Sequence, residues 1–485
     1  MSFIASRISA LASLMLLTGF FASVAAAKTP SSAFFLQPHD RVVFYGDSIT
    51  EQRLYTNDVA TFVHTRFPGL PATFINSGVG GDTVRGGWTG PLNVRLARDV
   101  FPFRPTIVVV MLGMNDVFGP HPLPSYERGY QLLVANLRKH LPRARLVLIG
   151  PSPFGDSATP NKVNDRLIAM SRFVRQLAKQ KNALFVDFNA PLVSAMARIG
   201  QTSPTLASKL IPGKIHPGAS GQLLMATALL KAWHAPATVT AVRIEARPLA
   251  AIRSDHTTIL HLSHHAGKIT WTQQDTALPF PIMNLHAHWP QFPPMSRTWT
   301  LNGIAVELPY SGPPQLTAFT NPIAKQVLRI AHFYRNLDTQ TLAVSGLTAA
   351  NYTLRINNTL VGTFTQKQLA DGINLAKYNT PMLQQAFRVL RQVWRISSMR
   401  YFAWRQLELT LYASTANQTQ TYVGSAWVHV KPGRIDNSPA AQRAVKQILA
   451  GYCKLVHLQR LRLRRIMQPL PAHYELSPAT GPITH

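Results

Sequence analysis

The stretch of the sequence best suited to chemistry is Val42–Glu51, where an apolar run ends at Gly46-Asp47 and Ser48 follows at once. This pattern places a hydroxyl at the carboxyl end of a buried strand, where sites on open α/β sheets are built. A serine hydroxyl is a weak nucleophile, so it needs a base and a group that stabilises an oxyanion. The sequence after Ser48 predicts a helix start, whose backbone N–H groups would face a developing negative charge and which Asp47 is expected to cap.

Three further polar clusters lie downstream, each next to a predicted strand or helix. Asn76–Thr83 holds three glycines in four residues, which lets a backbone N–H approach a substrate oxygen, although a plain glycine turn has the same composition. In Gly113–Asp116, Asn115 can present its side-chain NH₂ to an oxyanion, and Asp116 is expected to order the loop. His216 is the fourth candidate, because histidine is the usual general base for a serine.

The elements that must hold these clusters alternate between strand and helix patterns over residues 40 to 235. Short buried strands are predicted at Val42–Tyr45, Thr73–Asn76, Ile107–Leu112, Leu146–Gly150 and Leu184–Asp187. Helical patterns occupy Val59–Arg66, Tyr126–His140, Asn161–Gln180 and Gly218–Trp233. Such alternation predicts an α/β fold with a parallel sheet that helices cover on both faces.

Taken together and in this order, the four clusters resemble those of the SGNH hydrolases, the esterase and lipase superfamily also called GDSL. The family's four signature residues map onto Ser48, Gly81, Asn115 and His216, at separations of 33, 34 and 101 residues. The resemblance covers residues 40 to 235. It implies a three-layer α/β/α fold of flavodoxin-like topology, in a bacterial secreted member with a C-terminal extension.

The resemblance also implies ester hydrolysis through an acyl-enzyme. Ser48 would attack the ester and His216 would take its proton, while the Ser48 N–H, the Gly81 N–H and the Asn115 side chain would hold the oxyanion. No metal or organic cofactor is expected. One loose group of histidines lacks a convincing metal-ligand spacing, and it comprises His261, His264, His265, His286 and His288.

The sequence departs from the family at one position. The aspartate that usually stands three residues before the histidine is Gly213, and Ser208 to His216 contains no acid. In serine triads this acid fixes the histidine tautomer, and its loss can lower turnover by about 10⁴. Three interpretations stay open: a carbonyl or another side chain orients His216 in a working Ser48–His216 dyad, a distant aspartate swings in, or the enzyme is weak or dead. The distant candidates are first expected to have structural roles, and they are Asp47, Asp82, Asp116 and Asp187.

The first 27 residues have the pattern of a signal peptide. Arg7 gives a positive start, Ile8 to Val24 is apolar, and Ala25–Ala27 offers small residues for cleavage before Lys28. The alternative is an uncleaved membrane anchor, because the apolar stretch is near the lower limit for spanning. We predict cleavage, and hence a secreted or periplasmic protein without a stable membrane anchor. An SGNH domain at 28–236 and a C-terminal region at 237–485 would follow.

The residue pattern of the C-terminal region differs from that of the preceding domain, and the region contains no motif that indicates an activity. Period-two stretches at 238–275 and 341–365 predict β-structure, and Asn357-Asn358 is a plausible hairpin turn. Nine prolines between Pro279 and Pro322 argue for an irregular loop. Helices are predicted at 381–397 and 438–468. The second carries seven Lys or Arg and no acid between Ser438 and Tyr474, and its Cys453 is expected to be a buried structural thiol.

The formal net charge of +29 favours anionic partners in general. No nucleic-acid-binding signature accompanies it, so we expect no nucleic acid partner, and nothing indicates an oligomeric state. The leading hypothesis is a secreted esterase for acetyl or other short acyl groups, with an acylated polysaccharide preferred over a lipid as substrate. The competing hypothesis is a weak or dead SGNH-fold protein that binds an envelope or wall polymer. Trp88 could stack on a sugar, although packing in a core or loop is the commoner outcome.

Overall fold

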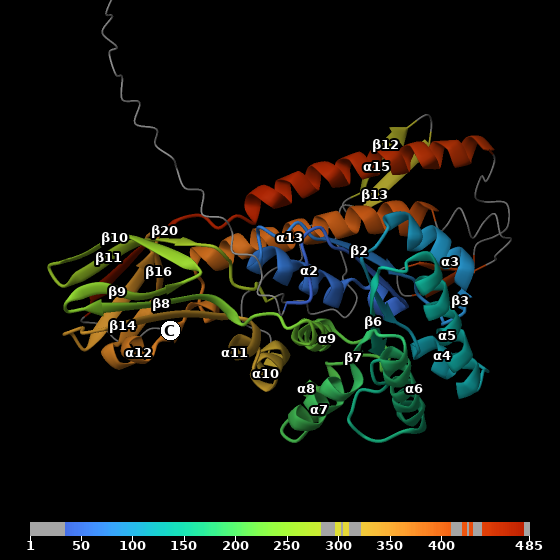
Figure 1. Ribbon diagram of the computed structural model, residues 1–485, viewed down its shortest axis with the longest axis horizontal. Helices are drawn as coiled ribbons and strands as arrows, with labels where there is room; N and C mark the ends of the chain where they lie inside the picture. The colour runs from blue at the N-terminus through green and yellow to red at the C-terminus, as the bar shows by residue number, and fades with distance from the viewer. Residues whose placement is uncertain are drawn as a thin grey trace, which may run out of the picture.

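The computed structural model of the chain describes residues 34–282, 296–301, 304–309, 322–408, 420–423, 426–429 and 439–479. We call residues 34–236 the N-terminal domain and residues 237–479 the C-terminal region. In Figure 1 the strands of the C-terminal region lie beside the N-terminal domain, while long helices of that region pack against it. The signal peptide predicted for residues 1–27 lies outside the described residues, so it stays a prediction. In the part of the chain that is described, no helix is long and apolar enough to cross a membrane.

A five-stranded parallel sheet forms the centre of the N-terminal domain, with the strand order β2-β1-β5-β6-β7. Its strands are β1 (Arg41–Gly46), β2 (Thr73–Gly78), β5 (Ile107–Met111), β6 (Arg145–Gly150) and β7 (Leu184–Asp187). Consecutive residues such as Val42 and Val43 of β1 are fully buried, as expected when helices cover both faces of a parallel sheet. All five strands predicted from the sequence are confirmed.

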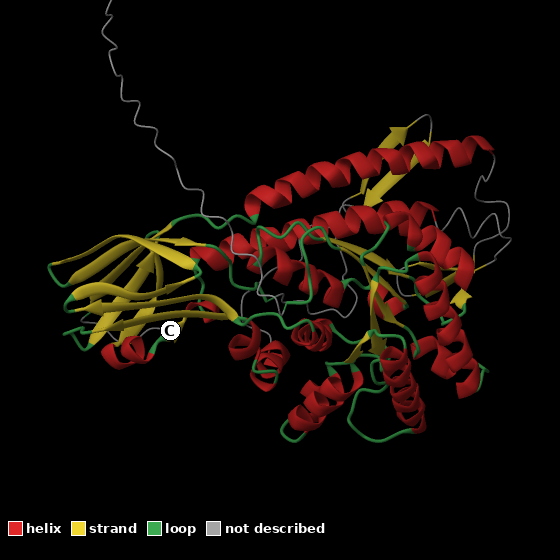
Figure 2. Cartoon of the chain, viewed as in Figure 1, coloured by secondary structure: helices red, strands yellow, loops and turns green. Residues whose placement is uncertain are grey.

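Helices on both sides of this sheet complete three α/β/α layers (Figure 2). Helix α2 (Leu54–Arg66) packs on α9 (Ala219–Ala232), and α5 (Leu123–His140) packs on α6 (Lys162–Gln180). These four helices confirm the helical patterns in the sequence. Shorter elements fill the connections: α1 (Ser48–Glu51), β3 (Gly86–Gly87), β4 (Gly90–Pro91), α3 (Leu92–Asp99), η1 (Phe101–Phe103), α4 (Met114–Phe118), α7 (Asn189–Gly200) and α8 (Pro204–Ser208).

Two sheets of the C-terminal region share one hydrophobic core. One sheet has the order β10-β11-β20-β15-β16 and the other β17-β14-β8-β9. Ile244 and Val344 of the second sheet belong to the same buried cluster as Trp271 and Tyr474 of the first, whose rings stack at 4.8 Å. The strands are β8 (Thr238–Ala246), β9 (Leu249–Asp255), β10 (Thr257–His265), β11 (Lys268–Asp275), β14 (Thr339–Ser345), β15 (Asn351–Ile356), β16 (Thr359–Thr365), β17 (Ile373–Asn374) and β20 (Ala472–Pro478).

A long helix, α13 (Pro381–Tyr401), connects these sheets with the N-terminal domain. Met382 and Ala386 of its first turns belong to the core of the two sheets. Phe387 and Trp394 pack with Leu54 of α2 instead. The helix continues as a π-helical segment, η3 (Phe402–Glu408), and α15 (Pro439–Ile466) packs alongside it (Figure 1). The remaining elements are α10 (Pro322–Ile330), α11 (Phe333–Leu337), α12 (Gln366–Asp371), η2 (Leu375–Lys377), β18 (Gln420–Val423) and β19 (Ala426–His429).

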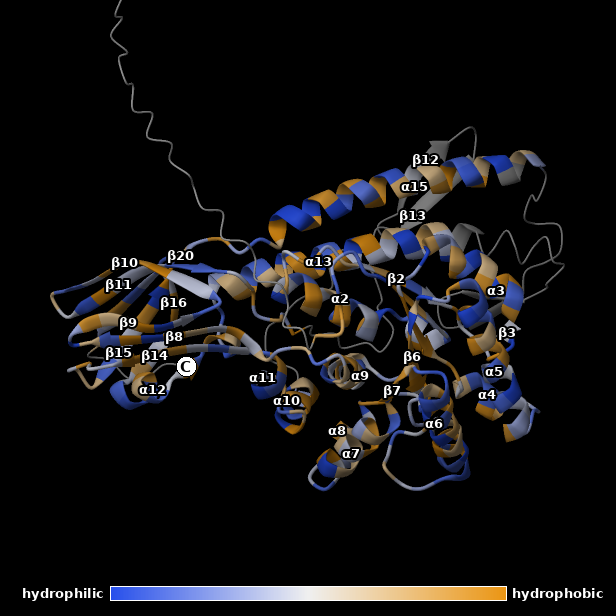
Figure 3. Ribbon diagram, viewed as in Figure 1, coloured by the Kyte–Doolittle hydropathy of each residue, from blue (hydrophilic) through white to orange (hydrophobic). Residues whose placement is uncertain are grey.

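Two expectations for the C-terminal region are wrong. The proline-rich segment contains an antiparallel ribbon, β12 (Ser296–Leu301) with β13 (Ile304–Pro309), whose β-branched and aromatic residues favour strands despite the flanking prolines. Cys453 is exposed, because α15 buries only one face, as its alternating hydrophilic and hydrophobic residues in Figure 3 indicate. The Asn357-Asn358 turn is confirmed, since both residues have positive φ (46° and 62°) and join β15 to β16.

Candidate active site

Three loops start from the same edge of the parallel sheet, because the strands that lead into them are neighbours. Gly46 at the end of β1 pairs with Gly78 at the end of β2 and with Met111 at the end of β5. The loop residues 47–48, 79–81 and 113–115 therefore follow strands that end side by side, the place where open α/β sheets hold their sites. The Val79 N–H also donates to the Gly46 carbonyl at 2.9 Å, which ties the second loop to the first.

Ser48 and His216 are in direct contact, with 2.8 Å between Oγ and Nε2. Ser48 is the first residue of α1 and is buried, while His216 is partly exposed. Asp47 caps α1 by accepting the Ile49 N–H at 3.0 Å, which is the role expected for it. Burial raises the pKa of the Asp47 carboxyl to about 7, and the hydrogen bond from Ile49 opposes that rise.

The loop that carries His216 is fastened by a buried glutamine. Gln222 of α9 has no exposed surface, and its Nε2 donates to the Pro217 carbonyl at 3.1 Å. Its Oε1 accepts the Tyr55 N–H at 3.0 Å, at the start of α2. Because Gln222 contacts both the residue after His216 and the helix that follows the Ser48 turn, it fixes one loop relative to the other.

Position 213, where the family usually has aspartate, faces open space. Gly213 has a φ of +75°, and a β-carbon at this position would meet nothing within 4 Å. A side chain here would have room, but its backbone would adopt a left-handed conformation that is uncommon for residues other than glycine. The neighbouring Lys214 is exposed, and its carbonyl accepts the Gly155 N–H at 2.8 Å.

The other aspartates that the sequence offered as replacements for the missing acid order their own surroundings. Asp82 forms an ion pair with Arg95 at 2.6 Å. Asp116 accepts a hydrogen bond from the Val84 N–H at 3.3 Å, and Asp187 accepts one from the Asn189 N–H at 2.8 Å. Together with the cap at Asp47, these contacts give all four residues the structural roles expected for them.

The glycine cluster forms a loop in which Gly80 is held at both of its polar backbone groups. Its N–H donates to the carboxylate of Glu51, and its carbonyl accepts the indole N–H of Trp88 at 2.8 Å. The next residue, Gly81, has a φ of +81°, in the left-handed region that favours glycine. Trp88, considered above as a residue that could stack on a sugar, therefore uses its indole N–H to hold this loop.

Asn115 joins the third loop to the glycine loop. Its Nδ2 donates to the carbonyl of Asp82, the residue after Gly81, at 2.8 Å. A side-chain NH₂ carries two hydrogens, so this contact occupies only one of them. The structure therefore brings Asn115 next to Gly81, and it brings Ser48 next to His216.

Sequence reasoning did not single out Glu51, Tyr401 and Arg405, which meet beside the glycine loop. Glu51 Oε1 accepts the Tyr401 hydroxyl at 2.9 Å and the Arg405 Nε–H at 2.6 Å. The side chains of Arg405 and Glu51 are each only 1% exposed. The Arg405 guanidinium also lies 4.8 Å from the centre of the Trp88 ring. Arg405 comes 354 residues after Glu51, so the only local signal was an acid three residues after Ser48.

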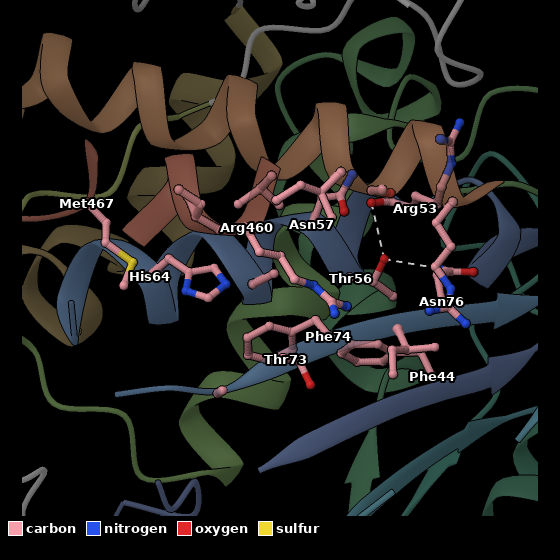
Figure 4. Close-up of a pocket in the computed structure, with 18 of the residues that line it drawn as sticks. Phe44, Arg53, Thr56, Asn57, His64, Thr73, Phe74, Asn76, Arg460 and Met467 are labelled. Carbon is pink, nitrogen blue, oxygen red and sulfur yellow. Dashed lines mark hydrogen bonds between the residues drawn. The ribbon is translucent and has the colours of Figure 1, made fainter. Parts of the chain in front are cut away.

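A cavity of about 80 Å³ lies between α2, β2, α13 and α15 (Figure 4). Phe74 and Met467 contribute to its largely apolar lining. His64 also lines it, and burial and the nearby Arg460 lower the pKa of this histidine to about 4. Neither Ser48 nor His216 lines this cavity, so it is separate from the pair that could do chemistry.

Within the described ranges, no group of three or more histidine, cysteine, aspartate or glutamate side chains could hold a metal ion. His286 and His288 of the loose histidine group lie outside these ranges.

Most of the N-terminal domain matches proteins that are already known. Residues 44–224 match the model of the GDSL-like lipase/acylhydrolase family, and this range contains all four residues that the sequence proposed for the site. An acetylxylan esterase of Geobacillus stearothermophilus is 27% identical over 216 residues, which make up 40% of this chain and 93% of that protein.

Solved structures extend the likeness to the C-terminal region. One described as BT4096, a gut microbial diltiazem-metabolizing enzyme, has a TM-score of 0.67 at 23% identity and covers 92% of this chain and 100% of its own. At this identity the likeness shows a shared fold alone. A catalytic mutant of Axe2, an acetylxylan esterase from Geobacillus stearothermophilus, covers 41% of this chain and 96% of its own at 24% identity, with a TM-score of only 0.36.

Proposed function

Because residues 44–224 belong to the GDSL-like lipase/acylhydrolase family, we propose that this protein is a serine esterase that works through Ser48 and His216. The observation that carries the proposal is the 2.8 Å contact between Ser48 Oγ and His216 Nε2. A serine becomes nucleophilic when a base lies within hydrogen-bond reach of its hydroxyl.

The reaction would run in two halves. Ser48 Oγ attacks the ester carbonyl carbon while His216 Nε2 takes the hydroxyl proton. The bond to the leaving alcohol then breaks, and His216 returns the proton to that alcohol's oxygen. In the second half a water attacks the acyl-enzyme and gives its proton to His216. The bond to Ser48 Oγ breaks, the carboxylic acid leaves, and the proton passes back to Ser48.

The oxyanion formed in each half would be held by the Ser48 N–H, the Gly81 N–H and the Asn115 side chain. Support comes from the position of Ser48 as the first residue of α1, because the first N–H groups of a helix have no partner within the helix. The hydrogen bond from Asn115 to the Asp82 carbonyl, which sets Asn115 beside Gly81, supports the other two. Each such donor typically contributes about 10²–10³ in rate.

Because Gly213 stands where a triad would have its aspartate, the nucleophile and the base form a dyad in this proposal. Without an aspartate at this position, the orientation of His216 would come from other groups, among them its own loop, which Gln222 fastens. Loss of the triad acid can lower turnover by about 10⁴, so the enzyme would be slower than relatives that keep the aspartate.

The substrate we propose is an acetyl or other short acyl ester, carried on a polysaccharide. The acetylxylan esterase that matches the N-terminal domain over 93% of its own length supports this choice. The signal peptide expected in residues 1–27 would place the enzyme outside the cytoplasm, secreted or periplasmic, where such polymers are found. No cofactor takes part in the proposed reaction.

The test is the hydrolysis of p-nitrophenyl acetate by the chain from Lys28 onward, measured from acidic to neutral pH for the wild type and for Ser48→Ala. We expect activity in the wild type and at least about a 10³-fold loss in the variant, because the nucleophile is gone. Equal rates for the two proteins would refute the proposal. If both are inactive, the competing hypothesis of an SGNH-fold protein that only binds an envelope or wall polymer gains ground.

A further inference from the structure

We propose that Arg405 and Tyr401 of the C-terminal region are positioning residues, which act through Glu51 to aim the Gly81 N–H at the oxyanion. The inference rests on the proposed function, because it takes the Gly81 N–H as an oxyanion donor. It makes the C-terminal region part of the esterase machinery, although that region supplies no group that touches the substrate.

The first step is the geometry of one peptide bond. The carbonyl of Gly80 and the N–H of Gly81 belong to the same planar peptide unit and point in opposite directions when the peptide is trans. The Trp88 indole N–H holds that carbonyl at 2.8 Å, and Glu51 holds the N–H of Gly80. With Gly80 fixed at both groups, the direction of the Gly81 N–H is fixed as well.

The second step concerns the contacts that fix Glu51 and Trp88, the two side chains that hold Gly80. Arg405 Nε and the Tyr401 hydroxyl both donate to Glu51 Oε1, at 2.6 and 2.9 Å, which leaves Oε2 to the loop. The Arg405 guanidinium also lies over the ring of Trp88, where a cation is attracted to the aromatic face. One residue of η3 therefore contacts both supports of the glycine loop.

The third step concerns charge. Glu51 is 1% exposed and stands three residues after Ser48. An unpaired carboxylate in this position would be costly to bury, and it would repel the negative charge that develops in the transition state. The guanidinium of Arg405 offsets both effects. A neutral side chain at position 405 would therefore leave the loop misdirected and the oxyanion less stable.

A simple docking role for Arg405 is the competing explanation, and the chain offers a matched control for it. Arg66 of α2 forms a second buried ion pair with the C-terminal region, 3.0 Å from Asp338, with side chains 2% and 0% exposed. The hydrogen bonds of its guanidinium go to Asp338 and to carbonyls of residues 236–238 and Leu337. None of them involves the glycine loop or Ser48.

The experiment compares Arg405→Met with Arg66→Met on p-nitrophenyl acetate, with melting temperature recorded for both. We expect Arg405→Met to lower kcat by about 10- to 100-fold with KM within about twofold, because a misdirected donor acts on the transition state alone. We expect Arg66→Met to lower the melting temperature while keeping the wild-type kcat. Arg405→Lys, which keeps the charge, should retain more activity than Arg405→Met.

A double-mutant cycle with Glu51→Gln tests whether Arg405 acts through that carboxylate. The loss in Glu51→Gln/Arg405→Met should be far smaller than the product of the two single losses, because both changes disturb one unit. Should Arg405→Met fail to fold, Tyr401→Phe removes a single hydroxyl from the same carboxylate and should lower kcat a few-fold.

The inference is overturned if Arg405→Met keeps wild-type kcat, or if Arg66→Met loses kcat to the same extent. Ser48→Ala separates this failure from failure of the proposed function. Activity that survives Ser48→Ala refutes the esterase mechanism itself, whereas an inactive Ser48→Ala beside a fully active Arg405→Met refutes only the role of Arg405.

Discussion

Two buried ion pairs join the N-terminal domain to the C-terminal region, and they differ in what else they touch. In the pair Arg66–Asp338, the arginine also donates to backbone carbonyls near the first strand of the C-terminal region. Arg405–Glu51 continues through Gly80 into the loop beside Ser48. Both are alike in chemistry and burial, so we expect the consequence of breaking each pair to depend on what that pair contacts next.

Asp338→Ala should have the largest effect on stability. It leaves the Arg66 guanidinium buried without its carboxylate, and breaking a buried pair in this way costs about 3–5 kcal/mol. The free energy of unfolding from urea titration measures this loss, and kcat measured at a temperature where the variant is folded should match the wild type. A kcat loss as large as that of Arg405→Met would erase the distinction between the two ion pairs.

Asp58→Asn should raise the stability at neutral pH and leave it unchanged at acidic pH. Asp58 is buried on α2, and burial raises the pKa of its carboxyl from 3.8 to about 8. Between those values the folded chain keeps a proton that the unfolded chain has lost, so stability falls as the pH rises, by at most about 1.4 kcal/mol per pH unit.

The Asp58→Asn variant lacks this titration. Its melting temperature should therefore exceed that of the wild type at pH 8 and approach it at pH 4. Melting curves across this range provide the measurement. Parallel curves for the two proteins would show that Asp58 is ionised in the folded chain, and the variant's kcat should be unchanged throughout.

Gly213→Asp should have the smallest effect on stability. Its kcat tests whether the missing acid limits the rate more than the direction of the glycine loop does. The left-handed backbone at this position costs an aspartate about 1 kcal/mol, while its side chain has open space. If His216 is poorly oriented, kcat should rise about tenfold or more. Gly213→Asn has nearly the same shape without the charge, so an equal gain in Asn would rule out a triad acid.

The N-terminal domain could be predicted from the sequence because its information is local. Strands β1 and β5 are short, mostly apolar runs, β2 contains the apolar pair Phe74-Ile75, and the residue types of the site follow within a few positions of each strand end. The same reasoning placed His216 just before α9, and the structure confirms its neighbourhood with Ser48. Asp47 and Asp116 could be given structural roles because caps and loop contacts also lie close in sequence.

The C-terminal region could be predicted only as a mixture of strands and helices. Strand β20, near the end of the chain, pairs with β11 and β15, which lie well over a hundred residues before it, and nothing near position 472 indicates those partners. The contact of Arg405 with the loop beside Ser48 could not be predicted for the same reason. Cys453 shows the opposite error, since an apolar helical stretch suggested burial that a helix packed on one face does not give.

The course of α13 has a consequence for recombination between proteins that share this architecture. The helix takes part in the core of the two C-terminal sheets at one end and leads into Arg405 at the other. A chimera that joins residues 34–236 to a foreign partner would keep the four motif residues but would leave Glu51 and Leu54 without the side chains that cover them. Transfer of the domain between proteins would therefore have to carry residues 381–408 with it, so the unit that can be exchanged is discontinuous in the gene.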